Sequence, residues 1–497
     1  MTGREVLMND AQAYQQCLEK LIWAKEQLQI EVDLTQLSQI ADLIVQPMMG
    51  VWRFFHTPQH IFEVGGDRDA IEVLAALFHD LVYVQVDRSI NFNVSYYITP
   101  FTKEVKGKLQ IREQAELPAD STFDLVMSVF GFVPAQELNP FSGQNEFLSA
   151  LVAAKALEPF MKSSQLVQIV TCIEATIPFR SKSELGLTPS EELYDRLQVA
   201  NDRFNLHLTE EEMQEAIKKA VRVANRDVGS FAHPSAAHFL ANTWNLLPET
   251  NHNLIGCSYK IRDYRVALQK MEGFMQFLKP EVVFRQFRGE PDEATYQGLE
   301  SRARKNIEIA RLYLGSKLVA IALIEAISLS IGLDVTLATM MGELPDESSG
   351  GVHLKSFIPD IPNAYPPKTD LERKVLYLLE KGRAESTRYD LENSPLATLI
   401  AKSVGFDEMQ YQCKQAKEFF KENMLAADFI SEFDLTVTEI VIEALVKLFE
   451  SRKSAISRYY YGITSESTPK PSTNSKVPPD RATDPSAFDI IKQYQQD

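Results

Sequence analysis

The sequence has few cysteines and fewer basic than acidic side chains, and each shortage excludes a class of protein. Its four cysteines are far apart and form no Cys-X-X-Cys pair, which excludes a disulfide scaffold and a thiolate zinc ribbon. The chain of 497 residues has 51 Lys and Arg against 68 Asp and Glu, a net charge of −17. This acidic balance argues against a general binder of nucleic acids or anionic membranes, which needs basic patches.

Long hydrophobic runs are also missing. The most apolar run, 318–333, contains Glu325, so we expect a buried helix and no membrane span. The polar N-terminal stretch MTGREVLMND lacks the apolar segment of a signal peptide. We therefore expect a soluble, cytoplasmic protein.

Strand signals are scarce, whereas helix signals recur along the chain. No Asn-Gly or Asp-Gly turn separates two alternating runs, and apolar residues repeat at spacings of three and four. Thr57-Pro58 and Thr188-Pro189 each place a capping hydroxyl before a first-turn proline, and Thr209 forms a capping box with Glu212. These patterns predict an all-α fold.

Two segments interrupt the helical pattern. Residues 345–367 are rich in proline and contain Gly350-Gly351, which predicts a linker or an irregular loop. Residues 462–497 are rich in Ser, Thr, Pro and Lys, which is typical of a disordered tail. The expected folded units are therefore residues 1–255, a helical extension 256–344 that packs on them, and a C-terminal helical domain 368–461.

The helix expected after Gly65-Gly66 carries the strongest chemical signal. Asp69 and Glu72 form a capping box at its start, and the segment IEVLAALFHDLVYV (71–84) is apolar on almost every side. His79 and Asp80 interrupt this apolar segment. A buried carboxylate without a partner costs several kcal/mol, so Asp80 needs a cation.

A second carboxylate occupies a core-facing position about 150 residues later. In the helix that begins after Thr209, the apolar stripe Met213, Ile217, Ala220 and Ala224 continues to Asp227. Thr57-Pro58 also places His60 in the first turn of a short helix, with His56 just before the cap.

Together, two imidazoles and two carboxylates form a candidate metal site of four residues: His60, His79, Asp80 and Asp227. This mixed set of nitrogen and oxygen ligands suits one divalent ion, which could be Mn, Fe, Co, Zn or Mg. A core histidine bonded to a backbone carbonyl is the alternative interpretation of His79.

Four segments resemble the HD-domain superfamily of metal-dependent phosphohydrolases, and most closely its poorly characterised branch. They are RFFHTPQHIFEV (53–64), LAALFHDLVY (74–83), CIEATIPF (172–179) and ANRDVGSFA (224–232), within a resemblance that covers roughly residues 15–250. The resemblance implies an HD-domain-like helical bundle, followed here by additional C-terminal helices. It also implies the metal ligands His60, His79, Asp80 and Asp227.

The sequence departs from two groups of this superfamily. Families with two metals have further histidines between the HD pair and the last Asp, where this chain has only His207. Alarmone hydrolases have a Glu-Asp pair after HD, where this chain has Tyr83 and Val84. These departures favour one metal ion.

The sequence therefore predicts a metal-dependent phosphohydrolase that acts through a metal-activated water. Its expected substrate is a small phosphoester, with nucleotides favoured over nucleic acids because of the net charge. We expect Asp80 and His56 to be catalytic and Arg53 and Arg226 to bind the substrate phosphate.

Two alternatives stay open. The first is a catalytically degenerate HD-fold protein with a regulatory or scaffolding role, which would bind a protein partner through its C-terminal helices and tail. The second is a helical module that holds no metal. Metal content and activity on phosphoesters distinguish the three.

Overall fold

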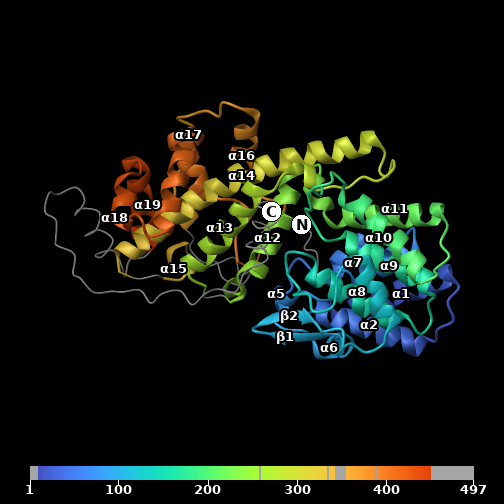
Figure 1. The fold of residues 1–497 in the computed structure, drawn as a ribbon. Coiled ribbons are helices and arrows are strands. Elements are labelled where there is room, and N and C mark those ends of the chain that lie inside the picture. Colours follow the sequence, from blue (N-terminus) through green and yellow to red (C-terminus); the bar gives the residue numbers. More distant parts are fainter. Residues whose placement is uncertain (1–8, 257–258, 333–334, 342–353, 388, 449–497) are drawn as a thin grey trace. The chain divides into compact units, whose positions relative to one another are not determined.

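The fold is all-α, as predicted: in the described part of the chain, the regular structure is helical apart from two short strands (Figure 1). The structure is a computed structural model that describes residues 9–256, 259–332, 335–341, 354–387 and 389–448. Within these ranges the regular strands are β1 (Thr102–Val105) and β2 (Lys108–Ile111), which pair antiparallel with Thr102 opposite Ile111. The expected tail at 462–497 lies outside the described residues.

The chain forms two compact units, and both are discontinuous in sequence. Among the described residues, the first unit contains 9–232 and 278–304, and the second contains 233–277 and 305–448. This division differs from the expected boundaries, because residues 278–304 belong to the first unit and 233–255 to the second. Of the expected linker 345–367, residues 354–367 are described and begin with the short 3-10 helix η4 (Leu354–Phe357).

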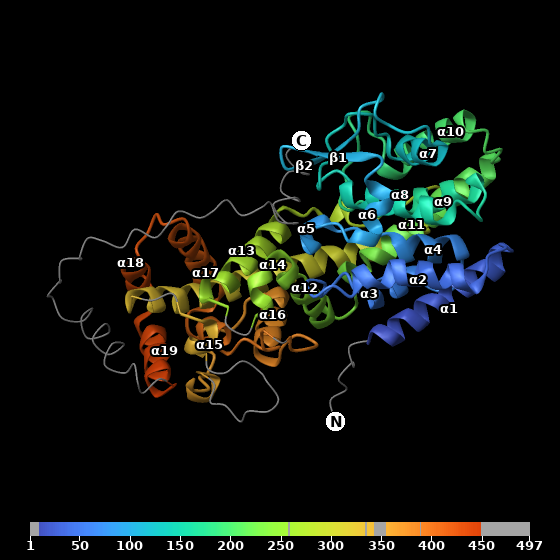
Figure 2. The same cartoon turned by 90° about the horizontal axis from the view of Figure 1, so that it is seen from below.

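Helices α8 and α9 lie between other helices of the first unit in both views (Figure 1, Figure 2). Helix α9 contacts α4, α8 and α11, so the elements of the candidate site share one core. The β1–β2 hairpin lies at the edge of this unit. The unit also contains residues 293–304 of α14 (Glu293–Ser330). Its other helices are α1 (Asp10–Leu28), α2 (Leu34–Met48), α3 (Pro58–Gly65), α4 (Ala70–Phe78), α5 (Val84–Asp87), α6 (Phe92–Ile98), α7 (Ser121–Phe130), α8 (Gln144–Leu157), α9 (Ser163–Ala175), α10 (Pro189–Arg203), α11 (Glu210–Asp227), η1 (Gly229–Ala232) and η3 (Pro280–Val282).

Three predicted helix starts are confirmed. Helices α3, α10 and α11 begin directly after Thr57, Thr188 and Thr209. Thr188 forms a capping box with Glu191, and Thr209 forms one with Glu212, whereas the Thr57 side chain makes no cap hydrogen bond. The fixed φ of Pro58 suits the first turn of α3 without that bond.

Helix α4 is shorter than the expected helix 71–84. Asp69 caps it by accepting hydrogen bonds from the backbone N–H groups of Ile71 and Glu72, and all nine residues of the helix are buried. The helix ends at Phe78, so His79 lies at its C-cap and Asp80 in the turn that follows. The two residues therefore lie in the turn after the helix, so their adjacent side chains are not held on different faces of a regular helix.

The second unit is made of α12 (Ala236–Thr250), η2 (His252–Ile255), α13 (Ile261–Phe277), residues 305–330 of α14 (Glu293–Ser330), α15 (Leu337–Met341), η4, α16 (Asp370–Lys381), α17 (Pro395–Phe420), α18 (Ala426–Ser431) and α19 (Leu435–Leu448). Helix α17 bends at Gly405, whose φ of 79° is not helical. That left-handed conformation is unstrained for glycine.

The apolar run expected at 318–333 forms the C-terminal part of α14. One window of this helix is long and apolar enough to span a membrane, but 83% of it is buried inside the protein. Glu325 is buried there and pairs with Arg265 of α13 through two contacts of 3.0 and 3.1 Å. A buried, charge-paired helix matches the sequence expectation, and the cytoplasmic location stays a prediction.

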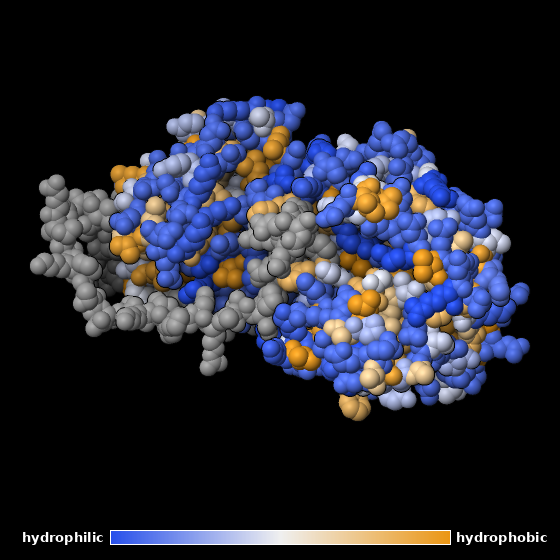
Figure 3. Space-filling view, in the orientation of Figure 1, coloured by the Kyte–Doolittle hydropathy of each residue, from blue (hydrophilic) through white to orange (hydrophobic). Residues whose placement is uncertain are grey.

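The surface is mainly hydrophilic on the face that Figure 3 presents. Hydrophobic residues on that face form separate small patches among polar and charged ones. This distribution is ordinary for a folded protein, because apolar side chains also contribute to most protein surfaces.

Candidate metal centre

The turn after α4 presents both residues of the His79-Asp80 pair. His79 is buried, and its Nδ1 lies 2.8 Å from the carbonyl oxygen of Ala76. Because a carbonyl oxygen only accepts hydrogen bonds, Nδ1 carries the proton and donates it. This bond fixes the ring orientation and points Nε2 toward Asp80 and Asp227.

Arg53 holds the backbone of this turn through its guanidinium group. Its buried guanidinium donates to both carboxylate oxygens of Asp87, at 2.8 and 2.6 Å. It also donates to the carbonyl oxygens of Asp80 and Leu81, at 2.7 and 3.3 Å. A bidentate contact of this kind fixes geometry as well as charge, so Arg53 positions Asp80.

Helix α8 supports the same segment through two hydrogen bonds. Ser149 Oγ accepts a hydrogen bond of 3.0 Å from the N–H of Val82, and Asn145 Oδ1 accepts one of 3.2 Å from Val84. The segment that contains Arg53 and helix α8 therefore both restrict the turn that carries Asp80 and the residues directly after it.

Glu72 connects α4 to the helix that carries Asp227. Its buried carboxylate accepts hydrogen bonds of 2.7 Å from both Arg222 and Arg226 of α11. Arg226 also donates to the carbonyl oxygen of Val64 in α3. These contacts fix the C-terminal end of α11, which carries Asp227, against α3 and α4.

All four predicted ligands meet at one point. One ligand atom from each of His60, His79, Asp80 and Asp227 lies within 4.8 Å of the other three. Asp227 Oδ1 is 3.0 Å from His60 Nε2 and 3.4 Å from His79 Nε2. Asp80 Oδ2 is 3.0 Å from His79 Nε2 and 3.4 Å from His60 Nε2.

These separations suit a shared cation. Two ligand atoms about 2.1 Å from one ion are about 3.0 Å apart at an octahedral angle and about 3.4 Å apart at a tetrahedral angle. The observed spacings of 3.0 and 3.4 Å fall on those values. The two-nitrogen, two-oxygen set fits the divalent ions Mn, Fe, Co, Zn and Mg.

His79 Nε2 and Asp80 Oδ2 need a proton or a metal ion to compensate them. Within the part of the chain that the structure describes, both atoms are buried, and their contact with each other at 3.0 Å is an ion pair only when the ring carries a second proton. Since Nδ1 of His79 already donates, a neutral ring would direct the lone pair of Nε2 at a carboxylate oxygen. A second proton or a metal ion removes that repulsion.

The pKa values show how strongly the four groups interact. Burial would lower the pKa of His60, but hydrogen bonds and charge from Asp227 and Asp80 outweigh it and raise that pKa to about 9. Burial also opposes charge on His79, yet the Asp80 and Asp227 carboxylates raise its pKa well above the ordinary value. Burial would raise the pKa of both carboxyls, but the imidazoles hold the Asp80 and Asp227 values below the usual range.

His56 lies beside the ligands and is not in the four-residue cluster. Its ring centroid is 6.0 Å from that of His60 and 4.5 Å from that of Tyr83, and its charge lowers the pKa of Asp80. A catalytic role for His56 stays a prediction. Substrate binding by Arg53 and Arg226 is also untested, although both guanidinium groups already have protein partners.

Sequence analysis overlooked Glu146, in the first turn of α8. Burial raises the pKa of its carboxyl to about 7, and the charges of Asp80 and Asp227 add to that rise. Glu146 is therefore electrostatically coupled to the site. The sequence does contain a sign of this residue, because Glu146 is an acid at the start of the apolar segment FLSALVAA (147–154). An acid in an apolar segment is the same pattern that identified Asp80.

The segment CIEATIPF supplies no ligand. Its acid, Glu174, is buried in α9 and forms ion pairs with Arg180 and Arg196. The charge of Arg180 also lowers the pKa of Glu146, so this pair of arginines belongs to the wider surroundings of the site.

Comparisons with known proteins add no relationship to these observations. No protein-family model, no curated protein and no solved structure matches the chain. The resemblance to the HD-domain superfamily therefore stays a prediction from the quoted segments.

The first prediction concerns metal, pH and stability. Without metal, protonation of His60 stabilises the fold fully below its unfolded pKa of about 6.5, and this contribution is lost as pH rises through about 9. A divalent ion replaces that proton. We expect one fixed concentration of Mn²⁺, about 100 times its Kd at pH 9, to raise the melting temperature by about 5–10 °C at pH 9 and by less at pH 6.

The matched control for this experiment is Asp227→Ala, which removes one carboxylate ligand. Its melting temperature should change little between chelator and Mn²⁺ at either pH. Differential scanning fluorimetry measures both proteins. Equal metal-induced shifts for wild type and variant would contradict a shared metal.

Proposed function

We propose that the first unit is an HD-type, divalent-metal-dependent phosphohydrolase that acts on a small phosphoester, with nucleotides the favoured class. The convergence of His60, His79, Asp80 and Asp227 within 4.8 Å carries this proposal. The close approach of Nε2 in His79 to Oδ2 in Asp80 supports it, because a proton or a metal ion must compensate these two buried atoms.

A divalent ion in this set of ligands would polarise a phosphoryl oxygen and lower the pKa of a water molecule. The chain's own task is to keep the ligands in place. The carbonyl of Ala76 fixes the ring of His79, and Arg53 fixes the turn that carries Asp80. Such supporting contacts commonly determine metal affinity.

Glu146 is our candidate for the group that moves a proton. A carboxyl with a pKa of about 7 exchanges its proton near neutral pH, whereas Asp80 and Asp227 stay ionised. A general acid near the working pH is the most effective one. We assign Glu146 the protonation of the leaving oxygen.

Arginine side chains compensate the buried carboxylate of Glu174. Arg180 and Arg196 pair with it, and their charges and that of Arg285 lower its pKa against the effect of burial. The net charge of −17 of the whole chain opposes large polyanions, which favours a small phosphate over a nucleic acid.

The second prediction tests the reaction through Asp80. Asp80→Ala removes a charged ligand and should lower kcat on the order of 10²–10³-fold, since each tenfold step is about 1.4 kcal/mol. His56→Ala should have a smaller effect. The assay screens an aryl phosphate, nucleoside mono-, di- and triphosphates and cyclic nucleotides with Mn²⁺, Mg²⁺ and Co²⁺.

Asp202→Ala is the control for this series, because Asp202 is exposed on α10. It should keep wild-type turnover. Hydrolysis that survives Asp80→Ala undiminished would refute the proposed site. A wild type that binds metal but hydrolyses none of these compounds would favour the regulatory or scaffolding alternative.

The third prediction separates proton transfer from metal binding. Glu146→Gln keeps the shape of the side chain but removes the acid, so kcat should fall about 10²-fold or more. In the wild type, the rate should fall as pH rises through the pKa of this acid, at or below about pH 7, and the variant should lose that fall. The metal-induced rise in melting temperature should persist.

Glu104→Gln, on the exposed strand β1, is the matched control. A profile for Glu146→Gln with the wild-type limb would show that another group transfers the proton. Loss of metal stabilisation in that variant would instead make Glu146 part of the metal centre.

A further inference from the structure

The second unit contains a cavity that the proposed phosphohydrolase site does not use. It has a volume of about 90 Å³. Its walls are mostly apolar and come mainly from α14 and the start of α17; they include Ala320, Ile321, Ile324, Leu337, Ile358 and Leu396. Lys317, Lys355, Asp390 and Asn393 also line it. Apolar walls with a few polar groups are typical of small-molecule sites.

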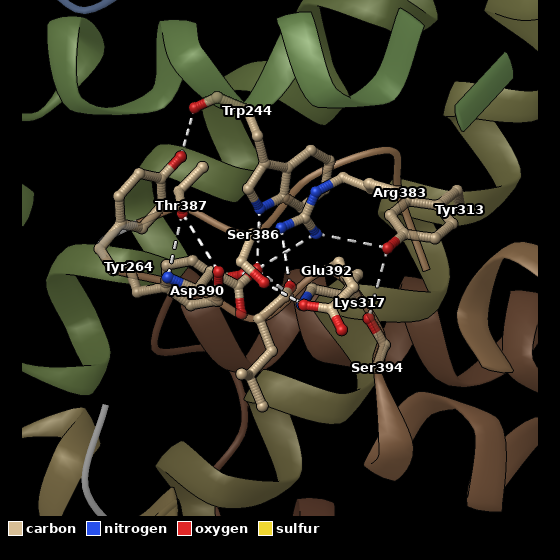
Figure 4. Close-up of polar contacts among 12 residues, drawn as sticks. Trp244, Tyr264, Tyr313, Lys317, Arg383, Ser386, Thr387, Asp390, Glu392 and Ser394 are labelled. Carbon is tan, nitrogen blue, oxygen red and sulfur yellow. Dashed lines mark hydrogen bonds and ion pairs between the residues drawn. The ribbon is translucent and has the colours of Figure 1, made fainter. Parts of the chain in front are cut away.

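One side of this cavity belongs to a buried polar network (Figure 4). Oδ2 of Asp390 accepts hydrogen bonds from Tyr264 at 2.6 Å, Trp244 Nε1 at 2.8 Å and Lys317 Nζ at 3.0 Å. Arg383 approaches the same oxygen to 3.4 Å. The donors come from α12, α13, α14 and the segment after α16, so four parts of the unit fix this carboxylate.

The network contains more buried positive than negative charge. The side chains of Lys317 and Arg383 are 9% and 0% exposed, and both pair with Asp390. Burial opposes charge on Asp390, but Lys317 and Arg383 outweigh it and keep its pKa below the ordinary value. One ionised carboxylate therefore faces two buried cations.

Two further charged residues lie around this pair. Burial raises the pKa of Glu392, but a hydrogen bond from Ser386 and the charges of Lys355 and Arg383 lower it, so Glu392 is ionised and offsets part of the positive charge. Lys355 lines the cavity at an exposed position. Among the described residues, the cavity lining itself therefore carries two cations, Lys317 and Lys355, and one carboxylate, Asp390, which favours an anion.

Lys317 is the cation that reaches the cavity. Arg383 is held by the protein, since it donates to the carbonyl oxygen of Leu391 and stacks 4.2 Å from the ring centroid of Trp244. Lys317 lines the cavity, and among the described residues Asp390 is the one carboxylate within ion-pair distance of it. An ammonium group has three donors, which leaves capacity for a ligand.

Asn393 supplies a second polar contact. Its side chain lines the cavity, and its Oδ1 is buried without a hydrogen-bond partner among the described residues. A side-chain amide offers an acceptor or, after a 180° rotation, a donor. A buried polar atom left unpaired costs free energy, which a polar ligand group would recover.

We propose that this cavity binds a small organic acid, with the apolar body of the ligand against α14 and α17 and its carboxylate at Lys317. Lys355 attracts the acid at the rim, and Asn393 contacts its polar end. The proposal needs no metal and is independent of the phosphohydrolase activity.

The experiment uses three probes with the same apolar body and different charge: 3-phenylpropionate, 3-phenylpropan-1-ol and 3-phenylpropylamine. Isothermal titration calorimetry on the full chain should show the acid binding at least about tenfold more tightly than the alcohol, the size of one charge-assisted hydrogen bond. The amine should bind most weakly.

Variants locate the binding. Lys317→Met should abolish the preference for the acid over the alcohol, and Lys355→Met, at an exposed position, should weaken acid binding by about threefold or less. Ile358→Trp should block all three probes by filling the cavity. Lys374→Met, at an exposed position of α16, is the control and should bind like wild type.

The melting temperature of each variant shows that it is folded. Equal affinity of the wild type for acid and alcohol would overturn the proposal. So would undetectable binding of the acid at millimolar concentration, or a preference for the acid that persists in both lysine variants.

Discussion

The first unit depends on compensation between two carboxylates and two imidazoles that share one buried point. Asp80 and Asp227 would repel each other there without positive charge, and His60 and His79 supply it when they are protonated. A divalent ion supplies the same charge without those protons. The surrounding contacts have one common effect: they keep the carboxylates close enough to need a cation. Arg53 holds the turn of Asp80, and Glu72 holds the helix end of Asp227.

The sequence was sufficient to predict the all-α fold and the residues of this cluster. An acid in an apolar segment identifies Asp80, and an acid that continues an apolar stripe identifies Asp227, because both patterns are local. The roles of Arg53 and Glu72 were not predictable in this way. Each depends on contacts with residues 34 and 150 positions away in the chain, and a charged residue gives no local sign of such partners.

The unit boundaries and the end of α4 show a second limit of sequence analysis. Residues 278–304 belong to the first unit although 233–277 separate them from it in sequence, and composition does not change at those points. Helix α4 ends at Phe78 although the apolar pattern resumes at Leu81 and Val82 after the His79-Asp80 pair. The hydrogen bonds of Ser149 and Asn145 to the backbone after Asp80 come from α8, so they become visible only once the helices have packed. Both units thus bury charge that long-range contacts hold in place: the four-residue cluster in the first, and the network around Asp390 in the second.

The central claim is that one cation bridges His60, His79, Asp80 and Asp227. Anomalous diffraction from crystals soaked in Mn²⁺, recorded near the manganese absorption edge, tests it most directly. The account predicts one strong peak in the first unit, within coordination distance of the four ligand atoms, and no such peak in Asp227→Ala crystals. A map without a peak there, with His79 Nε2 hydrogen-bonded directly to Asp80, would contradict the account and leave the cluster as a charge-paired core.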